Sequence, residues 1–305
     1  MPPAIHLHGI GKDFGSVRAL DGLGLSVERG EIVGLLGPNG SGKTTTLRIL
    51  AGYLRPDRGE VRVCGRVGYL PEKAPLYDAL PVTGQLDFVA GARGLNRAAR
   101  RREVARALAD YGLEEVRNRR IGTLSKGFRQ RVGLAQATLG DPEVLLLDEA
   151  TNGLDPLQMV EVRALIRRAG QGRAVLFSSH LMQEVTALCG RVYILHAGRV
   201  VAERRLDGEA PAVPAMADVH AGGIAAAALI HLLSALPGVA VVSGADTADG
   251  AVCRCRLDPG DDPRGRIAAA VVERASLLAL MPVAPTLEDV FLDAIRPAGP
   301  EGIAA

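Results

Sequence analysis

The sequence predicts an α/β protein whose main domain is built on a mostly parallel sheet with helices on both faces. Three short apolar runs, VLLLD, AVLFSS and RVYIL, alternate with helix-like segments. Strands that alternate with helices imply parallel pairing and two covered faces. A fourth apolar strand, EIVGLL, runs directly into a glycine-rich loop. With 305 residues, 48% of them hydrophobic, the chain can hold one large domain and a small second one.

The elements of the main domain follow from periodicity and turn signals. Alternation near residues 5–30 predicts short antiparallel strands, and residues 84–120 are polar and helical in pattern. A further helix begins after Ser125, where a serine can cap it. The remaining predictions are a strand over Glu31–Leu36, a helix from Lys43 to Ala51 that Gly52 stops, and helices over 157–169 and 181–188.

The C-terminal quarter has a different composition. Proline, alanine and glycine near residues 207–217 indicate a linker, which we place at 206–222. Residues 224–295 then predict a helix, strands at Val239–Ser243 and Val252–Leu257, a helix over 264–275, a strand and a helix. We expect a small α+β domain over residues 223–297, with a ferredoxin-like fold as the candidate.

Composition excludes several classes of protein. The net charge of +2 gives no case for a polyanion partner. Four scattered cysteines fit free thiols better than a metal site or a disulfide framework. The N-terminus lacks a signal region, and the most apolar run, Ile224–Leu236, is too short to span a bilayer. Arginines clustered over residues 97–106 suit a solvated helix face, with anionic lipid headgroups as the alternative.

The glycine-rich loop GPNGSGKTT has the spacing of a phosphate-binding loop. Glycines let successive backbone N–H groups point at phosphate oxygens, and the helix that follows adds its positive end. Lys43 should reach the β- and γ-phosphates, and the Thr44 hydroxyl should ligate Mg²⁺. The loop residues expected to bind nucleotide are Gly37, Pro38, Asn39, Gly40, Ser41, Gly42, Lys43, Thr44 and Thr45.

Polar residues follow two of the apolar strands. Asp148 ends VLLLD and could hold Mg²⁺, and Glu149 could polarise the attacking water. His180 follows AVLFSS at another strand end, where open α/β sheets place ligand contacts, and could stabilise charge at the γ-phosphate. Ser125 begins a helix whose positive end could bind an anion. Because the chain already has one phosphate loop, that anion would belong to the nucleotide of another copy; an ordinary helix cap is the alternative.

Together these motifs resemble the ATP-binding subunit of ATP-binding cassette (ABC) transporters. Residues 4–205 carry five family motifs in the family's order: the Walker A loop at 37–44, the signature Leu124–Gly127, the Walker B strand at 144–149, the D-loop Gly153–Pro156, and the switch His180. The resemblance implies a P-loop ATPase domain with an antiparallel β subdomain and a helical subdomain at about 73–140. It also implies that Phe14 stacks on adenine.

The resemblance further implies how the chain works. Lys43, Glu149 and His180 would be catalytic, with Glu149 as the base, and Thr44, Asp148 and Glu72 would hold the magnesium ion. Ser125 and Gly127 would complete the ATP site of a second copy, and Asp155 would couple the two sites. The partners implied are a second ATPase domain, in a homodimer, and a separate transmembrane permease, which places the chain on the cytoplasmic face of the cell membrane. No nucleic acid is expected.

The chain departs from the family pattern in three places. GYLPE puts Glu72 where most members have the Q-loop glutamine, and the signature reads Leu-Ser-Lys-Gly-Phe, with Phe128 in place of glutamine. Both resemble an exporter subfamily with drug-efflux, gliding-motility and copper-site-maturation members, as does the tail PTLEDVFL. The segment between VRVCG and GYLPE is short, so we expect a truncated strand or loop near residue 65.

The sequence therefore predicts an ATPase subunit that drives export by closing as a dimer over ATP. The alternative from another class is a soluble ABC ATPase that acts on nucleic acid or a protein assembly. Members of that class carry two cassettes, a coiled coil or a zinc module, and none of these is visible here. A third alternative is another P-loop enzyme such as a kinase. Leu124–Gly127 together with His180 argue against it, because such an enzyme would not need them.

Overall fold

We describe the protein from a computed structural model, which covers residues 2–206, 216–258, 262–283 and 287–295. The chain divides into two compact units, one formed by residues 1–207 with 293–305 and the other by residues 208–292. The first unit carries the glycine-rich loop and the five motifs from the Walker A loop to the switch His180. Each unit has its own hydrophobic core.

The first unit is centred on a six-stranded sheet with the order β5-β6-β7-β3-β8-β9. All neighbours pair in parallel except β8 and β9, which are antiparallel. The central strands are buried over almost their whole length, as a parallel sheet covered on both faces requires. The strands are β3 (Ile32–Leu36), β5 (Val67–Leu70), β6 (Val144–Asp148), β7 (Ala174–Ser179), β8 (Arg191–His196) and β9 (Arg199–Arg205).

A second, antiparallel sheet packs over one face of the first. Its order is β2-β1-β4, with β1 (Ile5–Phe14), β2 (Val17–Val27) and β4 (Arg58–Val63). Helix α1 (Lys43–Leu50) shares one core with both sheets, in which Leu47 of the helix meets Ile5 of β1 and Leu146 of β6. The expected short connection is present, since only residues 64–66 separate β4 from β5.

Helices α5 (Pro156–Gly170) and α6 (Met182–Leu188) cover the opposite face of the six-stranded sheet. A Cβ atom on Gly34 of β3 would lie 2.6 Å from Val185 of α6, so this helix packs directly on the strand backbone. Both helices agree with the sequence to within a residue at each end. Asp155 caps α5 and Pro156 occupies its first turn, a combination that marks a helix start.

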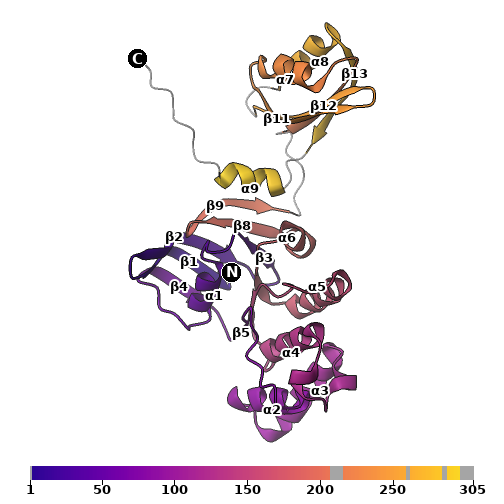
Figure 1. Cartoon of the computed structure of the whole chain (residues 1–305). Coiled ribbons are helices and arrows are strands. Elements are labelled where there is room, and N and C mark those ends of the chain that lie inside the picture. Colours follow the sequence, from indigo (N-terminus) through magenta and orange to yellow (C-terminus); the bar gives the residue numbers. More distant parts are fainter. Residues whose placement is uncertain (1, 207–215, 259–261, 284–286, 296–305) are drawn as a thin grey trace. The chain divides into compact units, whose positions relative to one another are not determined.

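A helical subdomain stands at one end of this unit (Figure 1). It contains α2 (Val82–Ala92), α3 (Arg97–Asp110) and α4 (Lys126–Thr138), with short 3₁₀ turns at Glu114–Val116 and Ile121–Thr123. The continuous helical stretch predicted over 84–120 is therefore interrupted. Gly94 takes a positive φ of 79° and Asn96 caps α3 through its side chain, so the chain turns between the two helices.

The second unit is a four-stranded antiparallel sheet with two helices between its strands. Its order is β11-β12-β10-β13 and the connection is βαββαβ, which confirms the ferredoxin-like topology. The elements are β10 (Met216–Gly222), α7 (Ala226–Ser234), β11 (Val239–Thr247), β12 (Gly250–Leu257), α8 (Arg264–Val272) and β13 (Ser276–Val283). Helix α9 (Leu287–Ile295) follows in the chain.

The core of this unit lies between one face of the sheet and the helices α7 and α8. Cys253 and Cys255 of β12 point into it, and both are free and buried. Burial raises the pKa of Cys255 to about 12, which keeps the thiol neutral.

The predicted linker over 206–222 needs a correction at its end. Residues 216–222 form β10, an inner strand of this sheet. Ala217, Val219 and Ala221 are buried on its core face, a strand pattern that small residues hide from a composition-based prediction. The rest of the linker, residues 207–215, lies outside the described residues, as do residues 296–297 of the predicted domain and the Pro285 of the tail motif.

Candidate functional site

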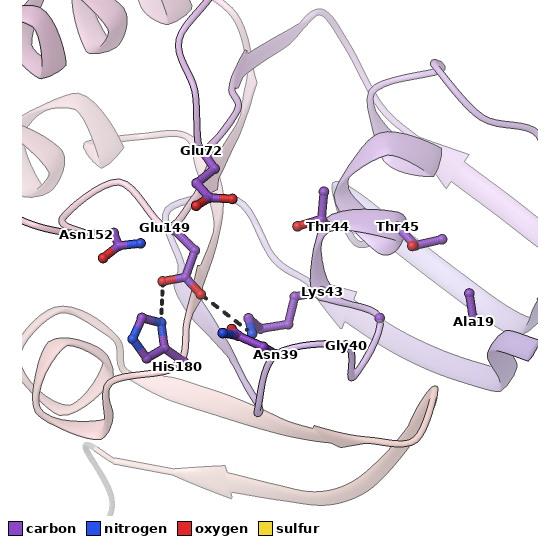
Figure 2. A pocket seen from close by; sticks show the side chains of 11 residues that line it. Ala19, Asn39, Gly40, Lys43, Thr44, Thr45, Glu72, Glu149, Asn152 and His180 are labelled. Carbon is purple, nitrogen blue, oxygen red and sulfur yellow. Dashed lines mark hydrogen bonds and ion pairs between the residues drawn. The ribbon is translucent and has the colours of Figure 1, made fainter. Parts of the chain in front are cut away.

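A pocket of about 330 Å³ opens where loops leave the carboxyl ends of β3, β6 and β7. Open α/β sheets bind ligands at this edge. The pocket is lined by Ala19, Asn39, Gly40, Gly42, Lys43, Thr44, Thr45, Glu72, Glu149, Asn152 and His180. Figure 2 shows these side chains converging from the glycine-rich loop, the strand ends and the segment after β5.

Two glycines shape the loop between β3 and α1. A Cβ atom on Gly37 would lie 2.3 Å from the carbonyl oxygen of Leu195, and one on Gly42 would lie 2.6 Å from Leu20. Gly42 also has a φ of 109°, which L side chains rarely adopt. No side chain caps the start of α1, so the N–H groups of its first turn remain available to an anion.

Lys43, Glu149 and His180 form a connected chain of charged and polar groups in the pocket (Figure 2). The Lys43 ammonium donates to the carbonyl oxygens of Gly37 and Pro38, at 2.8 and 3.2 Å. It also lies 3.5 Å from one carboxylate oxygen of Glu149. The other oxygen of Glu149 is 2.8 Å from Nδ1 of His180. Lys43 and Glu149 are both almost fully buried, where charge interactions are stronger than in water.

Glu149 has a strained backbone. Its φ of 51° is uncommon for a residue other than glycine and costs of the order of 1 kcal/mol. Ser178 of β7 holds this conformation, since the N–H of Glu149 donates to its carbonyl oxygen and its hydroxyl oxygen, both at 3.2 Å. Strain of this kind collects at functional sites, and here it carries the carboxylate between Lys43 and His180.

Asp148 lies fully buried at the end of β6, on the strand face that meets α1. The Ser178 hydroxyl donates to its Oδ1 at 2.6 Å, whereas its Oδ2 has no hydrogen-bond partner among the described residues. Buried carboxylate oxygens usually have one. With the Thr44 hydroxyl and the Glu72 carboxylate on the pocket wall, this oxygen suits a hard cation such as Mg²⁺, which needs few protein ligands beside phosphates and water.

The described residues contain no cluster of three or more histidine, cysteine or acidic side chains that could hold a metal unaided. Tyr69 of β5 lies near this region, and burial, with a smaller contribution from Asp148, raises the pKa of its hydroxyl to about 12. Tyr69 is consequently neutral and adds no charge beside Asp148.

Eight of the predicted site residues do not line this pocket: Phe14, Gly37, Pro38, Ser41, Ser125, Gly127, Asp148 and Asp155. Phe14 ends β1 with 48% of its surface exposed, and the Lys12 ammonium is 5.6 Å from its ring centre. Ser125 caps α4 by accepting from the N–H of Phe128, at a long 3.4 Å. Asp155 caps α5 by accepting from the N–H of Gln158 at 2.9 Å.

Two residues on the pocket wall were not predicted from the sequence. Ala19 comes from β2, five residues after Phe14, and its methyl side chain carries no chemical signal. Asn152 lies between the Walker B strand and the D-loop, and a polar side chain between two motifs is a signal from which its place in the pocket could have been predicted. Ser178, which orients both acidic residues, was also missed, because a serine inside an apolar strand looks like ordinary sheet.

The sequence of the chain is similar to those of known ABC transporter ATP-binding proteins. Residues 20–152 match the ABC transporter family. The chain is 39% identical over 229 residues to the uncharacterized ABC transporter ATP-binding protein YdbJ of Bacillus subtilis, covering 68% of this chain and 70% of that protein. It is 37% identical over 215 residues to the Nod factor export ATP-binding protein I of Burkholderia orbicola, covering 65% and 70% respectively.

A solved structure described as the ATP binding subunit of an ABC transporter has the same fold as the first unit. It superposes with a TM-score of 0.61 at 29% identity, covering 67% of this chain and 90% of that one. The family match spans the phosphate loop and the Walker B strand. The chain belongs to the family of ABC transporter ATP-binding proteins, and it is the ATP-hydrolysing subunit of such a transporter.

Proposed function

We propose that the chain hydrolyses magnesium-bound ATP in the pocket between the phosphate loop and Glu149, in a dimer of two copies that drives export through a separate membrane subunit. The observation that carries this proposal is the chain of contacts from Lys43 through Glu149 to His180. It joins a phosphate-binding ammonium, a carboxylate and an imidazole within hydrogen-bonding or ion-pair distance.

Each group has a distinct chemical task in this proposal. Backbone N–H groups of the loop and the Lys43 ammonium bind and orient the β- and γ-phosphates. Glu149 accepts a proton from the attacking water, and His180 holds that carboxylate and donates toward the γ-phosphate. A bound Mg²⁺, held by Thr44, Asp148 and Glu72, would neutralise phosphate charge. Phe14 keeps enough exposed ring to stack on adenine.

The dimer is proposed because the nucleotide contacts expected at Ser125 and Gly127 do not line the pocket of their own chain. Ser125 and Lys126 are exposed at the start of α4, while Gly127 is buried in the same turn. Leu157 at the start of α5 is 73% exposed and Leu181, next to His180, is 40% exposed. Exposed apolar side chains beside a functional edge are typical of an interaction surface, and a second copy would cover them while Ser125 and Gly127 meet its ATP.

Export is proposed from the departures Glu72, Lys126 and Phe128 and from the likeness to a relative named for Nod factor export. The described residues contain no helix that is both long and apolar enough to cross a membrane. For the contact with a permease we propose Tyr77 and Phe88. Their rings meet edge-on at 5.5 Å and are 56% and 52% exposed. Such a contact would hold the chain at the cytoplasmic face of the membrane.

A substitution at Ser125 tests the dimer. In a Glu149→Gln chain, which should retain ATP, we expect gel filtration with ATP and magnesium to give a dimer. Adding Ser125→Arg should leave a monomer, because the large cation fills the space for the partner's phosphate, while the ATP affinity measured by calorimetry changes less than about threefold. A matched control is Asn96→Arg, which removes the cap of α3 and should leave the dimer intact.

Loss of ATP binding by the monomeric Ser125→Arg chain would show that Ser125 acts on its own chain's nucleotide, against the proposal. Equal loss of the dimer in the Asn96 control would show that any damaged helix cap has this effect. A Glu149→Gln chain that stays monomeric with ATP would contradict the dimer itself.

A further inference from the structure

Helix α4 contacts the turn that follows Glu149 through a side chain of its second turn. The side-chain amide of Gln130, in the second turn of the helix, donates to the backbone carbonyl oxygen of Ala150 at 2.6 Å. Ala150 is the residue after Glu149 and is fully buried. Gln130 and Ala150 are 20 positions apart in the chain, and no family motif listed above includes Gln130.

The carbonyl group of Ala150 needs this partner. Residues 149–152 form a turn closed by the N–H of Asn152, which donates to the carbonyl oxygen of Glu149 at 2.9 Å. The carbonyl of Ala150, inside the turn, makes none of the backbone hydrogen bonds of the described residues that close turns and loops. A buried carbonyl left unpaired is costly, so the Gln130 amide fixes the orientation of the peptide that follows Glu149.

The turn is held from two sides. On one side the N–H of Glu149 donates to Ser178 of β7, which belongs to the rigid sheet. On the other side the Ala150 carbonyl accepts from Gln130, which belongs to α4. Because Glu149 has a positive φ, its conformation depends on such outside bonds. A small movement of α4 would therefore change the direction of the Glu149 carboxylate.

The first turn of α4 also packs closely on the D-loop. A Cβ atom on Gly153 would lie 2.1 Å from the Lys126 ammonium nitrogen, and one on Gly127 would lie 2.9 Å from the side chain of Gln158. The start of α4 therefore lies close to Gly153 of the D-loop and to Gln158 in the first turn of α5. Movement of the helix start would carry both the D-loop and, through Gln130, the turn of Glu149.

The neighbours of Gln130 on α4 bind elsewhere. Arg129 bonds to Asp78, in the segment before α2, and to the carbonyl of Ile121. Arg131 bonds to Glu161 of α5. Of these three successive residues, Gln130 is the one that reaches the catalytic turn. General packing between α4 and α5 can thus be perturbed at Arg131 without touching Glu149.

We propose that Gln130 is a positioning residue that ties the signature helix to the catalytic carboxylate of the same chain. It thereby makes the hydrolysis rate in one site depend on whether Ser125 of that chain has engaged the nucleotide of the other copy. This inference rests on the proposed roles of Glu149 and Ser125. It adds a physical connection, one amide–carbonyl bond, between the two half-sites that each chain contributes.

The test replaces Gln130 by methionine, which has nearly the same length and lacks the amide. We expect kcat for ATP hydrolysis by the full chain to fall at least about tenfold, because the Glu149 turn loses its second tether, while KM changes less than about threefold. In a Glu149→Gln background, Gln130→Met should still form the ATP-bound dimer, since α4 and Ser125 remain in place. Gln130→Lys keeps a donor and should recover most of kcat.

Arg131→Met is the matched control. It removes the Arg131–Glu161 ion pair between α4 and α5 and should leave kcat unchanged. Wild-type kcat in Gln130→Met, or an equal loss in Arg131→Met, would overturn the inference, as would a Lys variant no better than Met. Full hydrolysis by Glu149→Gln alone would instead refute the proposed base. If Gln130→Met does not fold, the ratio of kcat in Gln130→Lys to that in Gln130→Leu decides the question.

Discussion

The region of the nucleotide pocket contains strained backbone and unpaired polar atoms, whereas the central strands of the sheet in the second unit pair regularly. In the pocket, the loop takes a φ of 109° at Gly42, Glu149 takes one of 51°, and the buried oxygens Asp148 Oδ2 and Ser41 Oγ have no partner among the described residues. In the second unit, β10 and β12 pair from Met216–Arg256 to Gly222–Gly250 without a register shift. The difference indicates which region is built for a ligand.

The charged side chains repeat this contrast. In the second unit, on the face of the sheet that points away from its helices, Arg254 of β12 donates twice to Asp218 of β10, both bonds at 2.8 Å. The two charges therefore pair with each other. In the pocket, the Lys43 ammonium pairs with Glu149, while the Glu72 carboxylate also lines the wall and the buried Asp148 nearby has one oxygen without a partner among the described residues. A surplus of acid groups over local cations is costly, and a bound metal ion with its phosphates would balance it.

The largest effect that we expect from a substitution in the pocket is the loss of hydrolysis in Glu149→Gln. We expect hydrolysis to fall about 10²- to 10⁴-fold, because an amide cannot accept the proton of the attacking water. ATP binding and the unfolding midpoint should change little, since Gln keeps the volume of Glu and an oxygen that can accept from His180. Initial rates of phosphate release, together with calorimetric ATP binding, measure both quantities on the same sample.

The matched variant in the other unit is Asp218→Asn, an identical change of chemistry at a paired carboxylate. It should leave the rate of phosphate release within about twofold of the wild type. A comparable loss of hydrolysis in Asp218→Asn, or a wild-type rate in Glu149→Gln, would contradict the difference between a ligand-binding pocket and a surface whose charged side chains pair with each other.

The sequence predicted a large part of the pocket and missed what depends on long-range contact. Lys43, Thr44, Glu72, Glu149 and His180 were all expected at a phosphate site, and they line one pocket; their individual roles stay predictions. These residues could be predicted from the sequence because each follows a buried strand or a glycine-rich turn. Such strand ends meet at one edge of a parallel sheet.

Ser178 and Gln130 could not be predicted in the same way. Their partners lie 30 and 20 positions away in the chain, and neither residue is chemically unusual where it stands. The strand β10 was hidden for a related reason. Its MADVHAG sequence is rich in small residues, and Ala217 and Ala221 show their core positions only when β12 is beside them. Local composition therefore failed where pairing decides the structure.

The second prediction separates the stability of the second unit from catalysis. Leu229 of α7 is fully buried in the core of that unit, so Leu229→Ala should lower its free energy of unfolding by about 2–5 kcal/mol. Hydrolysis at 25 °C should remain at the wild-type rate. Hydrogen exchange of the β10 and β12 amides in the full chain reports the loss of stability, and phosphate release reports the rate.

Leu278→Ala is the control for this prediction. Leu278 is 59% exposed, and its truncation should change exchange of the same amides far less than Leu229→Ala does. If Leu229→Ala reduced hydrolysis by tenfold or more while the first unit kept its exchange protection, the second unit would take part in the ATPase cycle, and the separation of a catalytic region from a self-satisfied one would fail.

The smallest expected effect concerns the Asp218–Arg254 pair itself. The hydrogen bond from Arg254 lowers the pKa of Asp218 below its ordinary value of 3.8. A carboxyl group whose pKa is lower in the folded state stabilises that state fully above the unfolded pKa, and the contribution disappears as the pH falls through the folded pKa. Because the pair is partly exposed, we expect it to contribute no more than about 1 kcal/mol at pH 7.

Asp218→Asn should therefore lower the stability of the second unit slightly at pH 7 and hardly at all at a pH below the folded pKa of Asp218, where the wild type has lost the same interaction. Exchange of the β12 amides at pH 7 and chemical denaturation at both values of pH measure this difference. Asp249→Asn, at an exposed turn position without an ion pair among the described residues, should show no such pH-dependent difference. A stabilisation by Asp218 that persisted below its folded pKa would mean that packing of its side chain, rather than its charge, holds this face of the sheet together.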